Sequence, residues 1–147
     1  MRSAFRVLAI LIALGVVVQA GAIAFAWFDV IIELDEGATI DKNYEGNVGH
    51  DLHGIVGMMV MPVLGLALLI VSFFARIPSG VKWAAVVLGL IVLQVPLAIL
   101  SFTVTSGIGA LHGINALILA AVAGRTSALG RDTAPAGQAP AGTRAPV

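Results

Sequence analysis

Apolar residues follow one another along this chain of 147 residues in four long runs, which are separated by short polar segments. A membrane-spanning helix needs about 20 apolar residues, because it rises about 1.5 Å per residue across a hydrocarbon core about 30 Å thick. The first three runs reach this length, and the fourth reaches it when its helix begins near Thr105. The pattern predicts an all-α integral membrane four-helix bundle over residues 1–124, with up-down-up-down topology. The predicted spans are residues 7–28, 53–75, 83–103 and 105–124.

The segments between the runs complete this plan. An outer loop, 29–52, joins the first two spans, and the turn 77–80 is short enough to make the second and third spans antiparallel neighbours. Pro62 and Pro96 are expected to kink their helices. Residues 125–147 are rich in Ala, Pro, Gly and Thr and have no apolar periodicity, so we expect a disordered cytoplasmic tail.

The composition agrees with the predicted location in a membrane. Hydrophobic residues make up 59% of the chain and charged residues 11%, and the mean hydropathy is +1.04. These values exclude a soluble domain of this length. The absence of cysteine excludes disulfide and thiol chemistry. No P-loop, HExxH motif, nucleic-acid-binding patch or complete catalytic set is present, so a non-enzymatic role is favoured over an enzyme.

The charges predict the orientation. Seven of the eight Lys and Arg residues lie at the amino end, in the second loop or in the tail, and only Lys42 lies in the loop 29–52. The positive-inside rule then predicts a multi-pass plasma-membrane protein with both termini in the cytoplasm. Seven of the eight acidic residues crowd the outer loop, where they could attract a basic extracytoplasmic protein. These seven are Asp29, Glu33, Asp35, Glu36, Asp41, Glu45 and Asp51.

The first span has a second interpretation. Arg2, Arg6, the apolar run and the small residues of 24–26 are also features of a cleaved signal peptide. The unbroken apolar run through Phe28, with Trp27 at the membrane interface, favours a retained helix.

The tetrapeptide Leu-His-Gly-Ile occurs twice, with its histidines at His53 and His112. Ionisable residues at membrane depth are costly and need a function or a partner. In a four-helix bundle the second and fourth spans can lie diagonally across the core, so two imidazoles could bind one haem iron there. Gly54 and Gly113, next in the sequence, would leave room for the macrocycle. The alternative is that each histidine makes a structural hydrogen bond between helices.

The predicted depth differs between the two histidines. His53 is placed near the outer membrane boundary, and His112 about 6–10 Å inside it, from the rise of about 1.5 Å per residue. The chain has no histidine on the inner side, so one bis-histidine site at most is expected, in the outer half of the membrane.

Four further polar residues are candidates for supporting roles. His50 is three residues before His53. It could be a spare ligand, a proton carrier or a solvated loop residue. Gln19 and Gln94 lie near mid-membrane, where they are more typical of interhelical hydrogen bonds than of quinone ligands. Asn115 could orient His112 or pair with a glutamine. Because each glutamine precedes one Leu-His-Gly-Ile, a duplicated helical hairpin with a pseudo-two-fold axis is one interpretation, and coincidence is the other.

Short motifs occur over about residues 5 to 124, namely Val18-Gln19-Ala20-Gly21 with Phe25, Asp51-Leu52-His53 with Gly57, Leu93-Gln94, and Leu111-His112 with Asn115-Ala116. These motifs resemble an uncharacterised family of four-span actinobacterial membrane proteins. More distantly, the histidines of the second and fourth spans are similar to axial haem ligands in one half of a haem A synthase or in a b-type cytochrome. The first resemblance implies a four-helix membrane bundle, and the second implies His53 and His112 as haem ligands.

Three functions follow from these observations. The first is binding of one haem b through His53 and His112, for electron transfer or haem handling. The second is a non-enzymatic accessory subunit of a larger membrane complex, which the small residues of the fourth span favour. The third is a small carrier whose polar path uses the histidine of the fourth span and the amides of the bundle.

Overall fold

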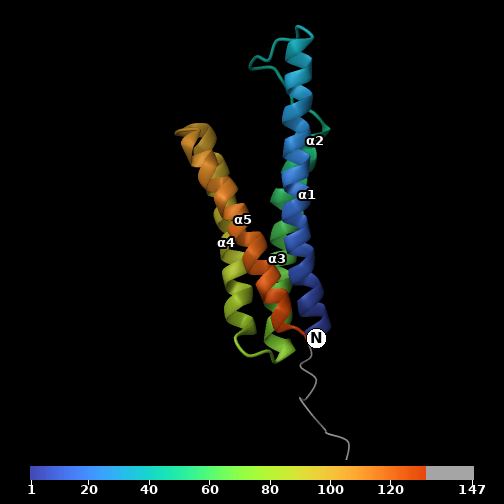
Figure 1. Cartoon of the computed structure of the whole chain (residues 1–147). Coiled ribbons are helices and arrows are strands. Elements are labelled where there is room, and N and C mark those ends of the chain that lie inside the picture. Colours follow the sequence, from blue (N-terminus) through green and yellow to red (C-terminus); the bar gives the residue numbers. More distant parts are fainter. Residues whose placement is uncertain (132–147) are drawn as a thin grey trace, which may run out of the picture.

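The computed structural model describes residues 1–131, and every regular element in this part of the chain is a helix (Figure 1). Four of the helical stretches are long and apolar enough to cross a membrane, which confirms the predicted all-α membrane bundle. The part of the predicted tail from residue 132 onward lies outside the described residues. The elements are α1 (Arg2–Asp35), α2 (Val48–Ile55), the π-helix η1 (Val56–Val60), α3 (Met61–Ala75), α4 (Gly80–Thr103) and α5 (Gly107–Leu129).

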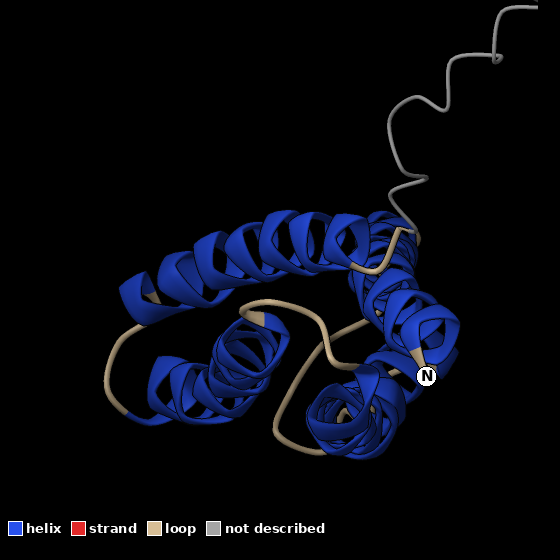
Figure 2. Cartoon of the chain, turned by 90° about the horizontal axis from the view of Figure 1, so that it is seen from below, coloured by secondary structure: helices blue, strands red, loops and turns tan. Residues whose placement is uncertain are grey.

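The helices form a ring in which the second and fourth spans lie on a diagonal. α1 packs against α3 and α5, and α4 packs against the same two helices (Figure 2). The second span consists of α2, η1 and α3 in succession, and the fourth span is α5. The diagonal arrangement expected for the histidine-bearing spans is therefore present.

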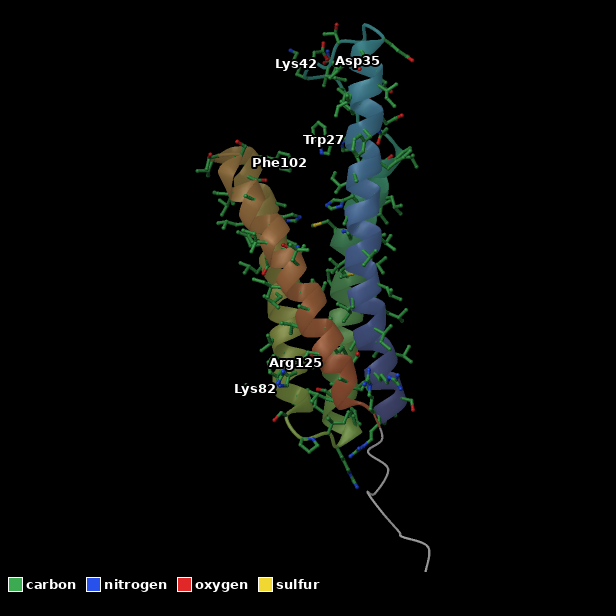
Figure 3. The ribbon with its side chains drawn as sticks, in the orientation of Figure 1. Trp27, Asp35, Lys42, Lys82, Phe102 and Arg125 are labelled. Atoms are coloured by element: carbon green, nitrogen blue, oxygen red, sulfur yellow. The ribbon has the colours of Figure 1, made fainter. Side chains whose placement is uncertain are left out.

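The two ends of the bundle carry opposite charges (Figure 3). The basic end holds the start of α1, the turn between α3 and α4, and the end of α5, with Lys82 and Arg125 near it. The acidic end holds the end of α1 and the loop after it, including Asp35 and Lys42. All acidic residues within positions 1–131 lie between Asp29 and Asp51.

The apolar core fills the half of the bundle nearer the basic end. Phe5, Ile12, Leu68, Val87 and Leu119 are almost fully buried there and hold the four spans together. Beyond this level the α4–α5 hairpin leans away from α1 and α2, so that the bundle opens toward the acidic end (Figure 1). The two hairpins are thus joined at one end and separated at the other.

Helix α1 and helix α2 stay together in the open half because small residues line their contact. Gly49 is buried against α1, and a Cβ at this position would stand 2.7 Å from the carbonyl oxygen of Ala22 and 2.9 Å from the Cβ of Ala26. A larger side chain has no space at this contact.

The second span changes its winding before its proline. The π-helix η1 precedes Pro62, which stands at the start of α3, whereas α4 continues as an α-helix through Pro96. Proline cannot donate a backbone hydrogen bond, and π-segments often accommodate such a break. The sequence predicted a kink at Pro62 and did not predict the π-segment.

Several helix bounds differ from the predicted spans, and three of the differences change the predicted loop and tail. α1 continues to Asp35 and α2 begins at Val48, so only residues 36–47 of the predicted loop 29–52 are non-helical. α1 ends just before Gly37, whose φ of +97° favours glycine, and α2 begins with a capping box between Asn47 and His50. α5 continues to Leu129, so residues 125–129 of the predicted tail are helical.

Candidate functional site

The two Leu-His-Gly-Ile histidines make the same contact on their respective hairpins. Nδ1 of His53 lies 3.0 Å from the carbonyl oxygen of Gln19, and Nδ1 of His112 lies 3.1 Å from the carbonyl oxygen of Gln94. A carbonyl only accepts hydrogen bonds, so each Nδ1 carries the proton and donates it. In the neutral ring this leaves Nε2 unprotonated, with its lone pair available to a metal ion.

The two imidazoles meet across the bundle. Their ring centres are 6.3 Å apart, and their planes are inclined by 55°. His53 comes from α2 and His112 from α5, so helices of the two diagonal spans supply one ring each.

Both histidines lie at the same depth. Gln19 precedes Trp27 by eight residues, and Gln94 precedes Phe102 by eight residues. Trp27 and Phe102 stand at similar heights in Figure 3, and eight helical residues span about 12 Å. The two rings therefore lie at a similar level along the bundle, whereas the sequence predicted that His112 lies deeper than His53. The sequence showed only where the second apolar run starts, and the side chain of His53 reaches the level of Gln19.

A cavity of about 360 Å³ lies between the separated hairpins. Much of its wall is made of glycine and alanine, and a Cβ at Gly54 or Gly113 would meet no atom within 4 Å. Because these wall residues have small side chains or none, the space between the two hairpins stays open beside the imidazoles. The glycine and alanine residues of the wall are Ala20, Gly54, Gly57, Ala98, Gly113 and Ala116, and the longer apolar ones include Val16, Ile23, Met58, Met61, Ile91, Leu117 and Leu119.

The glutamines of the two hairpins differ in their side chains. Nδ2 of Asn115 donates to Oε1 of Gln94 at 2.9 Å and to the carbonyl oxygen of Leu90 at 2.9 Å. Oε1 of Gln19 is buried and has no hydrogen-bond partner among the described residues. The position three residues after His53 is Val56, whereas Asn115 is three residues after His112. The expectation that Asn115 pairs with a glutamine is confirmed for Gln94 alone.

His50 does not join the cavity. Its Nδ1 lies 3.2 Å from the backbone nitrogen of Asn47 and accepts from it, and its ring packs edge-on against Trp27 and Tyr44. The described residues around the cavity include both Leu-His-Gly-Ile histidines and not His50. The capping-box spacing of Asn47 and His50 was the sequence feature that could have assigned this residue to a helix start.

Sequence reasoning missed two parts of the site. One is the pair of main-chain carbonyls, whose positions only the packing of neighbouring helices determines. The other is the part of the small-residue wall beyond Gly54 and Gly113, for which the spacing of Gly54 with Gly57 and of Gly113 with Ala116, three apart on each helix, was an available feature.

The side chains alone do not form a metal site. Among residues 1–131, no group of three or more His, Cys, Asp or Glu side chains is close enough to hold a metal ion. A metal between the two imidazoles would therefore need most of its ligands from another molecule.

Comparison of the chain with protein-family models, curated proteins and solved structures gave no match. The fold and the cavity define the class of this protein. It is an all-α membrane protein that has four candidate spans and, in its open half, a cavity lined by two histidines.

Proposed function

We propose that this protein binds one b-type haem between His53 and His112. The observation that carries the proposal is the distance between the two rings. Nδ1 of each ring lies on a main-chain carbonyl, so Nε2 of each histidine would be free to hold one metal ion between the two helices. The ring centres of His53 and His112 are 6.3 Å apart.

The donor set favours a haem over a bare metal ion. A porphyrin would bring most of the iron ligands itself, so the neutral imidazoles of His53 and His112 would be the only ligands required from the protein. This count suits a cavity that offers two histidines and no further ligating cluster among the described residues. Because the chain has no cysteine, the porphyrin would be held without thioether bonds, as in b-type proteins.

The surrounding residues support this proposal in three ways. The carbonyls of Gln19 and Gln94 hold the imidazoles in one tautomer and fix the direction of each ring. Gly54 and Gly113 leave flat space beside the histidines. Apolar wall residues such as Val16 and Ile23 would lower the polarity around a bound metal, which would affect its redox potential. The bound haem would supply one-electron redox chemistry.

The charge distribution supports a location and an orientation. We infer a plasma-membrane protein whose basic end faces the cytoplasm, because Lys and Arg are enriched on the cytoplasmic side of membrane proteins. The histidines then lie in the extracytoplasmic half of the bilayer. A quinone in the bilayer or a basic extracytoplasmic protein at the acidic end would be suitable electron donors or acceptors.

An absorption spectrum tests the proposal. The full chain is purified in mild detergent after expression with added haem precursor, and haem is measured by its Soret band and by extraction. We expect one haem per chain, and we expect His112→Ala and His53→Ala each to abolish six-coordinate low-spin haem. His50→Ala serves as the matched control and should keep the wild-type spectrum, because His50 does not line the cavity.

Folded protein that stays colourless after reconstitution with haem would overturn the proposal. The accessory-subunit interpretation would then take its place, and co-purification under native conditions would test it. A haem spectrum that survives loss of both histidines would also overturn it, since another residue would then hold the iron.

A further inference from the structure

A second hollow lies at the basic end, far from the histidines. It has a volume of about 200 Å³ and lies between the first turns of α1 and the residue after α5. Its lining residues are Ser3, Arg6, Val7, Ile10 and Gly130. Four of these belong to α1 at spacings of three and four residues, so they form one stripe along that helix.

The stripe changes from polar to apolar along the helix axis. Ser3 and Arg6 stand nearest the end of the bundle, and Val7 and Ile10 lie deeper in the span. A phospholipid has the same order, with a polar headgroup at the membrane surface and acyl chains below it. The hollow therefore offers a polar contact for a headgroup near the end of the bundle and an apolar contact for an acyl chain deeper in the span. This is the order in which a lipid at the basic end would need them.

Gly130 closes the other side of the hollow. A Cβ at this position would stand 2.9 Å from the Cβ of Arg6 and 3.1 Å from the carbonyl oxygen of Arg2. The missing side chain allows the end of α5 to approach the backbone of α1 at the level of Arg6. The close contact holds the backbone of Arg6 in place, so the Arg6 side chain extends from a fixed position at the edge of the hollow.

The charge of the basic end favours an anionic headgroup. Arg6 and Val7 are exposed, and Arg2, Arg76, Lys82 and Arg125 lie at the same end of the bundle. No acidic residue occurs in the sequence before Asp29 or between Asp51 and Arg131. Arginine binds phosphate through two parallel hydrogen bonds, and the hydroxyl of a serine such as Ser3 can donate one more.

We propose that the hollow formed by Ser3, Arg6, Val7, Ile10 and Gly130 binds one anionic phospholipid, with its phosphate at Arg6 and an acyl chain along Val7 and Ile10. Basic pockets between membrane helices are a recognised kind of lipid site. The site is independent of haem and of the direction in which the protein is inserted.

Native mass spectrometry of the full chain tests the proposal. The protein is released from mixed micelles that contain equal amounts of phosphatidylglycerol and phosphatidylcholine, and the retained lipids are counted. We expect one retained phosphatidylglycerol per chain in wild type. Arg6→Gln should lower the ratio of phosphatidylglycerol to phosphatidylcholine about fivefold, as expected for the loss of one cation at a lipid surface.

Two further variants distinguish specific binding of a lipid in the hollow from general attraction of anionic lipids to a basic surface. Arg125→Gln removes one charge at the same end, where the guanidinium carbon lies 5.0 Å from the ring centre of Trp83, and should leave the ratio unchanged. Val7→Trp keeps all charges, fills the chain part of the hollow and should remove the retained lipid. Circular dichroism confirms in each case that the variant is folded.

Three results would overturn the proposal. Equal losses in Arg6→Gln and Arg125→Gln would mean diffuse electrostatic attraction only. Retention of the lipid by folded Val7→Trp would show that no acyl chain lies along Val7 and Ile10. Displacement of the lipid by inorganic phosphate at millimolar concentration would identify an anion site and not a lipid site.

Discussion

Gly49 of α2 lies directly against Ala22 of α1, with 2.7 Å between the carbonyl oxygen of Ala22 and the place that a Cβ of residue 49 would occupy. This contact joins the two helices in the half of the bundle where the other hairpin has separated. It also lies one helical turn from His53, whose ring depends on the same helix pair for its hydrogen bond to Gln19.

Gly49→Ala should therefore loosen the α1–α2 pair and shift His53. We expect a loss of about 1–3 kcal/mol in unfolding free energy, as for other overpacked contacts, together with weaker haem binding. Reversible unfolding in mixed detergent, followed by circular dichroism, measures the loss. Gly21→Ala on α1 is the control, because a Cβ there would meet no atom within 4 Å. A Gly49→Ala protein as stable as wild type would contradict the close contact.

Filling the cavity should separate haem binding from folding. Gly113→Leu places a side chain in the space beside His112, where a Cβ has no neighbour within 4 Å, so the bundle should fold and lose most of the proposed haem. The pigment-to-protein ratio of the purified protein gives the answer.

Gly124→Leu is the matched control for this experiment. It makes the same change on the same helix, also without a neighbour within 4 Å, and Gly124 does not line the cavity. Equal pigment in the two variants would place the haem elsewhere.

The two glutamines should respond differently to the same substitution. Gln94→Leu removes the acceptor of one Asn115 hydrogen bond, which should cost about 0.5–1.5 kcal/mol of unfolding free energy. Gln19→Leu removes a buried oxygen that has no partner, and such an oxygen costs about 1–3 kcal/mol, so this variant should be as stable as wild type or more stable. Denaturation of both variants under one detergent condition measures the difference. An equal loss in both would mean that the amide of Gln19 is also hydrogen-bonded.

Tyr44 gives a spectroscopic test of the acidic end. Desolvation, followed by the nearby carboxylates of Glu33 and Asp29, raises the pKa of Tyr44 above its ordinary value of 10.0. A raised pKa favours the protonated ring in the folded state, so its contribution to stability is complete below pH 10.0 and is lost as the pH rises through the higher folded pKa. Because the chain has one tyrosine, phenolate absorbance near 295 nm reports this group alone.

The pH titration should show a midpoint above that of the unfolded chain. In Glu33→Gln the midpoint should move down toward the ordinary value, since one negative charge near the phenol is gone. A midpoint equal to that of the unfolded chain would show that residues 36–47 do not hold Tyr44 near these carboxylates.

The sequence by itself determined the four membrane helices. Hydrocarbon leaves backbone groups no partner except one another, and a helix satisfies these groups within a single apolar run of about 20 residues. It also determined the polarity of the bundle through the separation of Arg and Lys from Asp and Glu, and it singled out His53 and His112 as a pair. The helix ends were less predictable, because α1 and α2 continue beyond the apolar runs until Gly37 and Asn47 end and start them.

Only the tertiary structure decided how the two histidines are placed. The ring separation of 6.3 Å, the common depth and the tautomer all depend on which carbonyls the neighbouring helices present. The same is true of His50, whose spacing from His53 suggested a shared helix face and whose ring instead belongs to a helix cap. Hydrophobicity is a local property that a sequence displays residue by residue. The distance between two side chains on diagonal helices depends on every small and large residue that sets the spacing of the bundle.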